Sequence, residues 1–138
     1  MLIDRLSLKF SGDYIKKVIS AKYASIHTRP NFNIQRGQPA LVMQHDEGQW
    51  CPNTMKWGYG SDRSAEQRII NARTEGILAQ PSFRFAIRER RIVVPIDSFY
   101  IEAIKDQQTK VYRVVPFNDS IMYLAGIWEP LDQVNNGF

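Results

Sequence analysis

RRIVVPIDSFY, at residues 90–100, opens the part of the sequence that decides the fold. Four runs rich in β-branched and aromatic residues follow one another from there, at residues 91–96, 99–104, 110–117 and 120–128. Short turn-forming segments separate them, at residues 97–98, 105–108 and 118–119. Strands joined by such short turns pair as antiparallel neighbours. The sequence therefore predicts an α+β fold: a mostly antiparallel, strongly curved sheet or partial β-barrel with a few packed helices.

The first half of the chain carries signals for helices as well as strands. A helix is predicted at residues 12–23, because Ser11 can cap it and apolar residues recur at three- and four-residue intervals. A short helix is expected at 74–79, and Pro81 should break it before a second one at 82–89. Strands are predicted at residues 40–43, at 55–59 and from 69 onward. Three segments are expected to lack regular structure, at residues 29–33, 45–49 and 131–138.

Length and composition indicate one globular domain over residues 1–138, since 43% of the residues are hydrophobic and 23% are charged. The sequence contains no apolar run long enough to cross a bilayer, and its first residues lack the basic-then-apolar order of a secretory signal. A cytoplasmic location is expected. Cys51 is the single cysteine and His27 and His45 are the two histidines, so neither a metal nor another cofactor is expected. Cys51 itself is predicted to be a buried apolar residue.

The positive charge of the chain is modest, with a net charge of +4 and a pI near 9.3, but part of it is clustered. Four arginines and two phenylalanines interleave within a short segment: Phe83, Arg84, Phe85, Arg88, Arg90 and Arg91. Arginines beside aromatic rings suit a phosphate backbone with stacked bases. The same pattern also fits a helix with an apolar face and a solvated basic face, and the sequence leaves both interpretations open.

A second informative stretch is IINARTE, at residues 69–75. Like the segment at 90–100, it places polar groups at the end of an apolar, strand-like run. A β-scaffold holds such groups rigidly at a surface cleft, which is how many binding and catalytic sites are built. The two stretches together are therefore the strongest indication of a functional site.

Five sequence elements occur here in the order found in one known family: FNI at 32–34, KWG at 56–58, NARTE at 71–75, the segment at 90–100, and AGIWE at 125–129. On these residues the chain resembles the SOS-response-associated peptidase (SRAP) family, whose members bind single-stranded DNA at abasic sites and cross-link to them through an N-terminal cysteine. The resemblance runs over essentially the whole chain and implies one SRAP-like domain. In that family a C-terminal third, which carries a functional histidine, follows the point where this sequence stops.

The reaction that the resemblance implies needs two nucleophiles on the N-terminal residue. An α-amine condenses with the aldehyde of the ring-opened abasic sugar, and a cysteine thiol then closes a stable thiazolidine. Position 2 of this chain is Leu2, which supplies no thiol and whose bulk should also hinder removal of Met1. The stable cross-link is therefore not expected. A weaker alternative is a reversible imine through the Met1 amine, which has a reference pKa of about 7.7–8.0.

Other family roles map onto residues of this chain. Asn71 and Arg73 occupy the positions that hold the abasic nucleotide and its phosphates, and the alternative is that Arg73 and Glu75 only bridge turns. Ile101 occupies the position of the acid–base glutamate, and Glu102 follows one residue later. Because side chains alternate along a strand, Glu102 should face away from the site unless a bulge restores its direction. Arg36 replaces a family proline and adds a possible phosphate contact.

The sequence thus favours binding over catalysis. We expect single-stranded or abasic DNA as the partner, in a DNA-damage context, without the covalent chemistry. The candidate catalytic residues are Asn71 and Glu102, and the candidate DNA-binding residues are Arg5, Arg36, Trp57, Arg73, Arg90 and Arg91. The alternatives are the reversible imine and a non-enzymatic interaction protein that associates with itself through an unpaired sheet edge. Peptidase activity has the weakest support, because it would also need the absent thiol.

Overall fold

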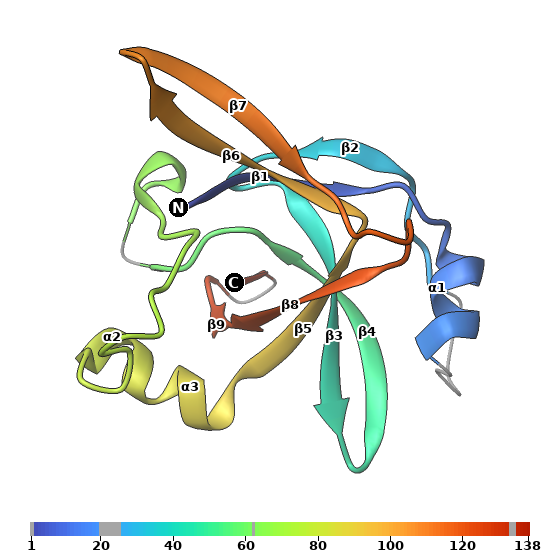
Figure 1. The fold of residues 1–138 in the computed structure, drawn as a ribbon. Coiled ribbons are helices and arrows are strands. Elements are labelled where there is room, and N and C mark those ends of the chain that lie inside the picture. Colours follow the sequence, from blue (N-terminus) through green and yellow to red (C-terminus); the bar gives the residue numbers. More distant parts are fainter. Residues whose placement is uncertain (1, 20–25, 62, 133–134) are drawn as a thin grey trace.

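The computed structural model describes residues 2–19, 26–61, 63–132 and 135–138. Its strands form two sheets that curl around a shared core as a partial barrel, which confirms the predicted α+β fold (Figure 1). The first sheet contains, in spatial order, β2 (Asn31–Ile34), β1 (Ile3–Leu8), β6 (Ser98–Lys105) and β7 (Gln108–Val114). The second contains β8 (Met122–Ile127), β5 (Arg91–Ile96), β3 (Pro39–Asp46), β4 (Gln49–Lys56), β10 (Asn136–Gly137) and β9 (Glu129–Pro130).

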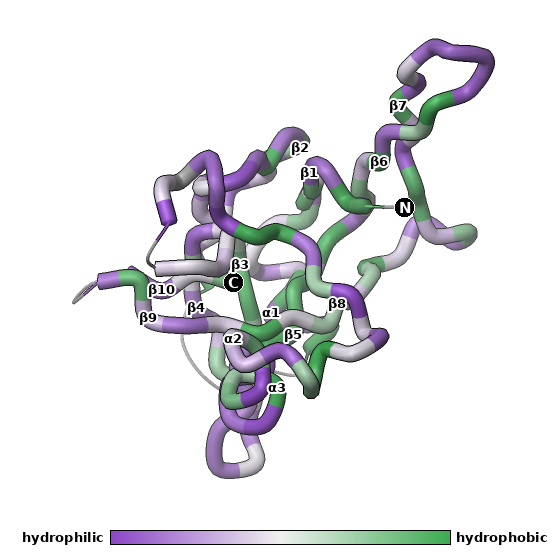
Figure 2. The backbone as a smooth tube through the Cα atoms, turned by 90° about the vertical axis from the view of Figure 1, so that its left-hand side faces the viewer, coloured by the Kyte–Doolittle hydropathy of each residue, from purple (hydrophilic) through white to green (hydrophobic). Residues whose placement is uncertain are grey.

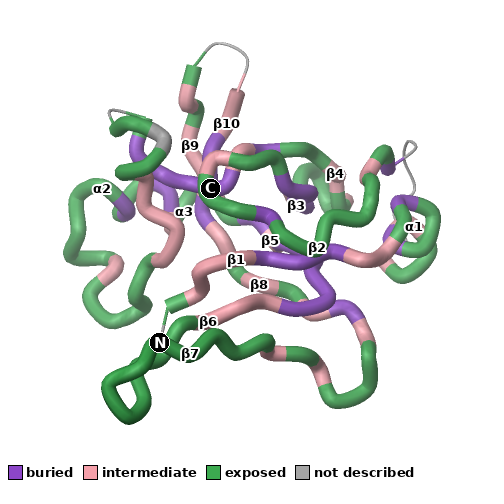
Figure 3. The backbone as a smooth tube through the Cα atoms, turned by 90° about the horizontal axis from the view of Figure 1, so that it is seen from above, coloured by how far each residue is buried: buried purple, intermediate pink, exposed green. Residues whose placement is uncertain are grey.

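The pairings within the two sheets are antiparallel, except that β10 runs parallel to β4. The β6–β7 hairpin projects from the body of the molecule and is exposed along most of its length (Figure 3). Its tip is hydrophilic, as Figure 2 shows. The tip turns through Asp106 and Gln107, which both have positive φ and therefore form the type of two-residue turn that fits the twist of a hairpin.

Within the described residues, helical structure is limited to short elements at the edges of the sheets. They are α1 (Gly12–Ile19), the 3-10 turn η1 (Ala65–Gln67), α2 (Pro81–Arg84) and α3 (Ala86–Glu89). The helix predicted at 12–23 is confirmed as far as Ile19, and residues 20–23 lie outside the described residues. The helix predicted at 82–89 is present as α2 and α3, separated at Phe85. No helix of the described chain is long and apolar enough to span a membrane.

The four strands predicted in the second half are confirmed within three residues at each end, and β5 has the predicted bounds. The boundaries predicted around the first hairpin were wrong. Residues 45–49 are not an irregular segment. They are the adjoining ends of β3 and β4 and the tight turn between them, in which Glu47 and Gly48 have positive φ. β4 accordingly starts at Gln49, and it ends before Gly58, whose φ of +141° is unfavourable for a residue with a side chain.

Several other local predictions were also wrong. Ile69 starts no strand and makes only an isolated bridge to Tyr59. Residues 74–79 form turns instead of a helix, and Gly76 lies there at a positive φ that interrupts helical geometry. The segment at 29–33 was expected to be irregular but leads into β2, and β1 was not predicted. Residues 131–138 contain β10, and the terminal Phe138 is only 8% exposed in the core.

The core lies between the two sheets and takes its side chains from nearly every strand. Leu6 of β1, Val42 of β3 and Ile96 of β5 are almost fully buried there. Their burial follows from the alternation of inward and outward side chains along each strand. A smaller second cluster packs α2 and α3 against β8 through Tyr59, Phe83, Ala86 and Ile127. The two clusters border the cavity described next.

Candidate nucleic-acid interface

The side chain of Asn71 holds the N-terminal strand. The Ile3 backbone N–H donates to Asn71 Oδ1 at 2.9 Å, and Asn71 Nδ2 donates to the Ile3 carbonyl at 2.7 Å. Both backbone hydrogen-bonding groups of Ile3 are thereby satisfied by one side chain. Leu2, which precedes this clamp, is 53% exposed. The clamp therefore fixes the direction in which the chain leaves β1 toward its N-terminus.

An apolar cavity of about 280 Å³ lies beside this clamp. Asn71 and Thr74 contribute its polar edge, and β8 forms one wall through residues 124–127. The remaining walls are apolar side chains from both sheets and from the α2–α3 segment, among them Ile3, Trp57, Tyr59, Ile69, Phe83 and Ile87. A cavity with this lining favours apolar or planar groups over charged ones.

A second, polar groove of about 510 Å³ opens on the other side of Ile70, whose side chain lines both spaces. Its charged lining combines two arginines with three carboxylates: Arg5, Arg36, Asp4, Glu66 and Glu102. Gln35 completes the lining. Three of the predicted site residues, Arg5, Arg36 and Glu102, therefore share one groove.

The arginines of this groove are oriented by their neighbours. Arg5 Nε donates to Asp4 Oδ2 at 3.0 Å, and its guanidinium lies 5.0 Å from the centre of the Tyr100 ring. Arg36 donates to the backbone carbonyl of Glu66. Each arginine uses only part of its five donors in these contacts, so further guanidinium N–H groups remain for a phosphate.

Asn71 lines the apolar cavity, whereas Glu102 lines the polar groove. Ile101 pairs with Ile3 in the β1–β6 ladder, next to the Asn71 clamp, whereas Glu102 lines the polar groove. A bulge does occur nearby, but it lies in β1 between Ile3 and Arg5. The one-residue displacement of the glutamate thus puts an apolar side chain beside the clamp and a carboxylate beside Arg5 and Arg36.

The other candidate residues lie elsewhere. Arg73 is exposed, and within the described chain it has no hydrogen-bond or ion-pair partner. Arg90 is held at the α2–α3 end of the cavity, with its guanidinium 4.7 Å from the Phe85 ring centre and 5.5 Å from that of Trp128. Arg91 is exposed and donates to the Ile87 carbonyl at 2.5 Å. Neither Arg90 nor Arg91 lines the groove of Arg5 and Arg36.

Trp57 was a candidate DNA-binding residue, and the structure places it in the core with 3% exposure. It forms part of the cavity wall and offers no ring face on the outer surface. Cys51 was expected to be buried, but it is half-buried on β4, in the hairpin that projects away from the clamp. Among the described residues no group of three or more His, Cys, Asp or Glu side chains could hold a metal ion.

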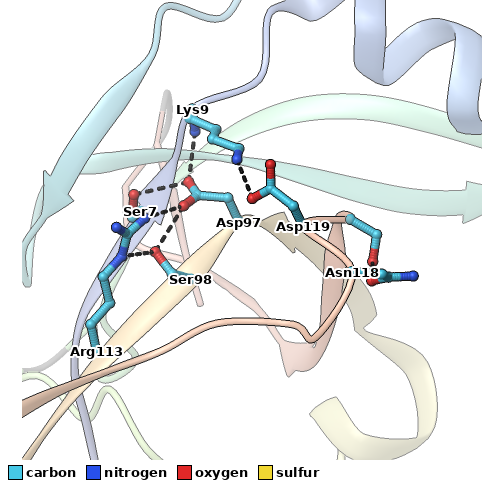
Figure 4. A network of polar contacts seen from close by, with 8 residues as sticks. Ser7, Lys9, Asp97, Ser98, Arg113, Asn118 and Asp119 are labelled. Atoms are coloured by element: carbon cyan, nitrogen blue, oxygen red, sulfur yellow. Dashed lines mark hydrogen bonds and ion pairs between the residues drawn. The ribbon is translucent and has the colours of Figure 1, made fainter.

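The sequence interpretation missed a polar cluster that holds β1 at the end opposite the Asn71 clamp, around Ser7 and Lys9. Asp97 is 3% exposed and accepts from Ser7 Oγ at 2.9 Å, from the Lys9 backbone N–H at 2.7 Å and from Ser98 Oγ at 2.8 Å. Arg113 of β7 adds an ion pair at 2.9 Å, so four groups from three strands and a loop converge on one carboxylate (Figure 4). The only sequence signal for the role of Asp97 was its position in the segment at residues 90–100.

The electrostatics of this carboxylate follow from its contacts. Burial alone would raise the pKa of Asp97, but the hydrogen bonds from Ser98, Ser7, Lys9 and Arg113 outweigh it and hold that pKa below the ordinary value. The charged form is therefore the stable one in the folded protein. Asp97 joins β1, β6 and β7 and thereby fixes the strand that carries Arg5.

Glu129 and Tyr59 form a second contact that the sequence did not reveal. Glu129 Oε1 accepts from the backbone N–H of Gly60 and, at 2.7 Å, from that of Ser61. The Tyr59 hydroxyl donates to the Ser82 carbonyl at 2.8 Å, and burial, with Glu129 nearby, raises the pKa of Tyr59. These contacts tie the loop after β4 to β9 and to α2 at the far end of the cavity.

The chain is thus an α+β half-barrel protein in which the clamped strand β1 lies between an apolar cavity and a polar groove. The family model for SOS response associated peptidase (SRAP) matches residues 4–137, and the chain belongs to that family. The resemblance noted from the sequence is thereby confirmed.

Curated relatives carry the name abasic site processing protein. The chain is 28% identical to YoaM of Bacillus subtilis over 106 residues, which are 73% of this chain and 47% of that protein. It is 29% identical to YoqW of Bacillus phage SPbeta over 105 residues, 72% of this chain and 47% of that protein. The chain thus spans about half the length of the curated relatives it matches.

Solved structures share the fold at low sequence identity. A protein from Bacteroides thetaiotaomicron superposes with a TM-score of 0.77 at 16% identity, over 96% of this chain and 65% of that one. A phage-related protein from Bordetella bronchiseptica gives 0.73 at 23% identity, over 97% of this chain and 68% of the other. At these identities the likeness establishes the fold alone.

Proposed function

We propose that this chain binds single-stranded DNA at abasic sites without forming the family's thiazolidine cross-link. The observation that carries the proposal is the juxtaposition of the Asn71 clamp with the groove of Arg5 and Arg36. Family membership and the names of the curated relatives support DNA containing abasic sites as the ligand. The groove supplies cationic donors for phosphates, and the clamp holds β1 at its edge.

The absence of a covalent step in this proposal follows from Leu2. An imine formed by an amine alone hydrolyses readily, and the chain has no thiol at position 2 that could trap it. The groove carboxylates, Asp4, Glu66 and Glu102, reduce its net attraction for DNA, so affinity should be moderate. Arg73, exposed two residues after Asn71, is a further phosphate contact in this proposal.

A fluorescence anisotropy titration with a labelled single-stranded oligonucleotide tests the proposal. Three arginine–phosphate contacts predict a slope of about −2 in log affinity against log salt, or a roughly 20-fold loss between about 50 and about 200 mM salt. The double variant Arg5→Gln/Arg36→Gln should bind more weakly and lose about two-thirds of that slope. Lys17→Gln, which removes one exposed charge from α1, is the matched control and should change little.

An oligonucleotide with a single abasic site and its intact counterpart are compared in the same titration. Tighter binding of the abasic strand supports abasic-site recognition, and equal binding reduces the proposal to single-stranded DNA in general. Binding that is absent, or indifferent to salt, rejects it. Reduction with borohydride in the presence of the abasic strand tests the alternative of a reversible imine at the Met1 amine, which requires a covalent adduct under these conditions.

A further inference from the structure

A second cationic surface lies on α2 and α3, and none of its residues lines the groove of Arg5 and Arg36. We call it the α2–α3 surface, and its four members are all exposed: Arg84, Phe85, Arg88 and Arg91. Residues 81–91 contain four arginines and one glutamate, a net charge of +3, whereas the groove combines two arginines with three carboxylates. The α2–α3 surface is therefore the better electrostatic match for a polyanion.

Phe85 is the unusual residue of this surface. The backbone stays helical through it, with φ of −73° and ψ of −49°, so α2 and α3 continue one helical path. Phe83 and Ala86 face the core with 4% and 1% exposure and pack with Tyr59 and Ile127. Phe85 lies between them in the sequence and is 57% exposed. An amphipathic helix that covers the core explains the buried pair but does not explain a phenylalanine among arginines on the outer face.

The ring of Phe85 is held in place by Arg90. The Arg90 guanidinium lies 4.7 Å from the centre of the Phe85 ring and 5.5 Å from that of Trp128, distances at which a cation attracts an aromatic face. Trp128 is half-buried and packs against the main core. Phe85 is thus linked through Arg90 to an anchored ring while more than half of its own surface stays accessible. A positioned, accessible ring suits the stacking of an unpaired base.

The arginines of the α2–α3 surface keep donors for phosphates. Arg84 Nε donates to the Leu78 carbonyl at 3.3 Å, and Arg91 Nε donates to the Ile87 carbonyl at 2.5 Å, so the terminal N–H groups of both remain. The Arg88 side chain has no hydrogen-bond or ion-pair partner among the described residues. Residues four apart on a helix have Cβ atoms about 5–6 Å from each other, so Arg84 and Arg88 can contact neighbouring phosphates of one strand.

The α2–α3 surface and the Asn71 clamp border the same cavity. Phe83 and Ile87 line the cavity from the inner face of α2 and α3, and Asn71 and Thr74 line it at the clamp. Arg73 is exposed in the segment that connects the two. A strand bound at the clamp can therefore reach the α2–α3 surface past Arg73 and the mouth of the cavity.

We propose that the α2–α3 surface binds the same DNA strand as the groove of Arg5 and Arg36, with an unpaired base stacked on Phe85 and phosphates held by Arg84 and Arg88. This inference rests on the proposed function, because the strand is the one that the groove holds. It adds the attraction for phosphates that the groove, with its three carboxylates, largely lacks. The strand is single at this point, because base faces inside a duplex are covered by their neighbours.

Substitutions of Phe85 test the stacked base by fluorescence anisotropy. Phe85→Ala should weaken binding of a single-stranded oligonucleotide of about 12 nucleotides by about tenfold, the loss expected for one stacked base. Phe85→Trp keeps an aromatic ring and should bind within about twofold of the wild type. Its added indole should also be quenched by the oligonucleotide, beyond the quenching seen in the wild type. Phe117→Ala removes an exposed ring outside both surfaces and should change nothing.

The salt dependence of binding tests the phosphate contacts. Five arginine contacts predict a slope of about −3.5 in log affinity against log salt, instead of the value of about −2 expected from Arg5, Arg36 and Arg73 alone. Arg84→Gln/Arg88→Gln should reduce the steepness by about 1.4. Lys16→Gln/Lys17→Gln removes the same charge from α1, on the opposite side of the molecule from α2 and α3 (Figures 1 and 3), and should leave the slope unchanged. Far-UV circular dichroism confirms that the variants are folded.

The outcomes separate this inference from the proposed function. A wild-type slope of about −2 that Arg84→Gln/Arg88→Gln leaves unchanged overturns the inference and leaves the groove intact. Weaker binding by the α2–α3 variants, with Arg5→Gln/Arg36→Gln unaffected, supports the α2–α3 surface and rejects the groove. Two oligonucleotides per chain at saturation overturn the shared strand. A duplex that Phe85→Ala weakens as much as the single strand overturns the stacked base.

Discussion

Asn71 and Ile3, 68 positions apart in the sequence, are joined by two hydrogen bonds of 2.9 and 2.7 Å between one side-chain amide and one backbone unit. The amide thus acts on the protein's own N-terminal strand. A residue expected to orient a nucleotide is, in the free protein, the group that positions β1 at the border between the apolar cavity and the polar groove.

Asn71→Ala should lower both stability and DNA affinity. It leaves two partly buried backbone groups of Ile3 without partners, which should cost about 1–3 kcal/mol in the free energy of unfolding, measured by urea denaturation. Asn53→Ala is the control, because it also removes two hydrogen bonds of one side-chain amide, to Gln44 Oε1 and from the Thr54 backbone N–H, but at an exposed position, and should cost less than about 0.5 kcal/mol. Equal effects of the two substitutions would show that the clamp contributes nothing.

Asp97→Asn should lower the free energy of unfolding and weaken the dependence of that free energy on pH in the acid range. The pKa of Asp97 is lower in the folded state than in the unfolded state, so the folded state binds fewer protons. Its stabilisation is therefore complete above the unfolded pKa of about 3.9 and is lost as pH falls through the lower, folded pKa. Urea unfolding of the wild type and of Asp97→Asn, from pH 7 to pH 3, measures this pH dependence.

At pH 7 the substitution should cost about 2–3 kcal/mol, because the amide replaces an acceptor with a donor that faces other donors. The difference between the two proteins should shrink toward pH 3. A difference that stays constant over this range would assign the loss to packing instead of charge.

Glu102→Gln should tighten DNA binding. The carboxylate lies in the groove of Arg5 and Arg36 and repels phosphate, so its neutralisation should raise affinity by about two- to threefold at low salt and by less at high salt. Glu47→Gln in the β3–β4 turn removes the same charge from a distant site and is the control. Weaker binding by Glu102→Gln, with the control unchanged, would instead assign the carboxylate a direct contact with the nucleotide.

Leu2→Cys should allow the chain to form a stable cross-link to abasic DNA. A cysteine at this position permits removal of Met1 and supplies both an amine for the imine and a thiol that adds to it, with water as the leaving molecule. The expected result is an adduct that survives a denaturing gel without borohydride. Leu2→Ser, which offers no thiol, should give none. If Leu2→Cys also gives none, a thiol at position 2 is not sufficient for a cross-link in this chain.

The strands of the second half could be predicted from the sequence because their signals are local. β5 to β8 are runs of β-branched and aromatic residues with turn residues between them, and β6 and β7 pair across their turn as predicted. The pairing expected across the turns at 97–98 and 118–119 was wrong, because β5 pairs with β3 and β8 in the second sheet, whereas β6 and β7 belong to the first. β1 and β10 are different, because β1 pairs with β6 and β10 with β4 across long stretches of chain. Pairing energy from distant segments leaves no mark in the local pattern, so these strands were missed.

The sequence by itself determined the curved antiparallel architecture, the positions of Asn71, Arg73 and Glu102 along the chain, and the absence of a thiol at Leu2, since all of these follow from residue identity and short-range periodicity. The tertiary structure alone decided that Asn71 binds Ile3 and that Glu102 shares a groove with Arg5. Each of these depends on which distant segments meet, and hydrogen bonds between distant segments form only in the assembled fold.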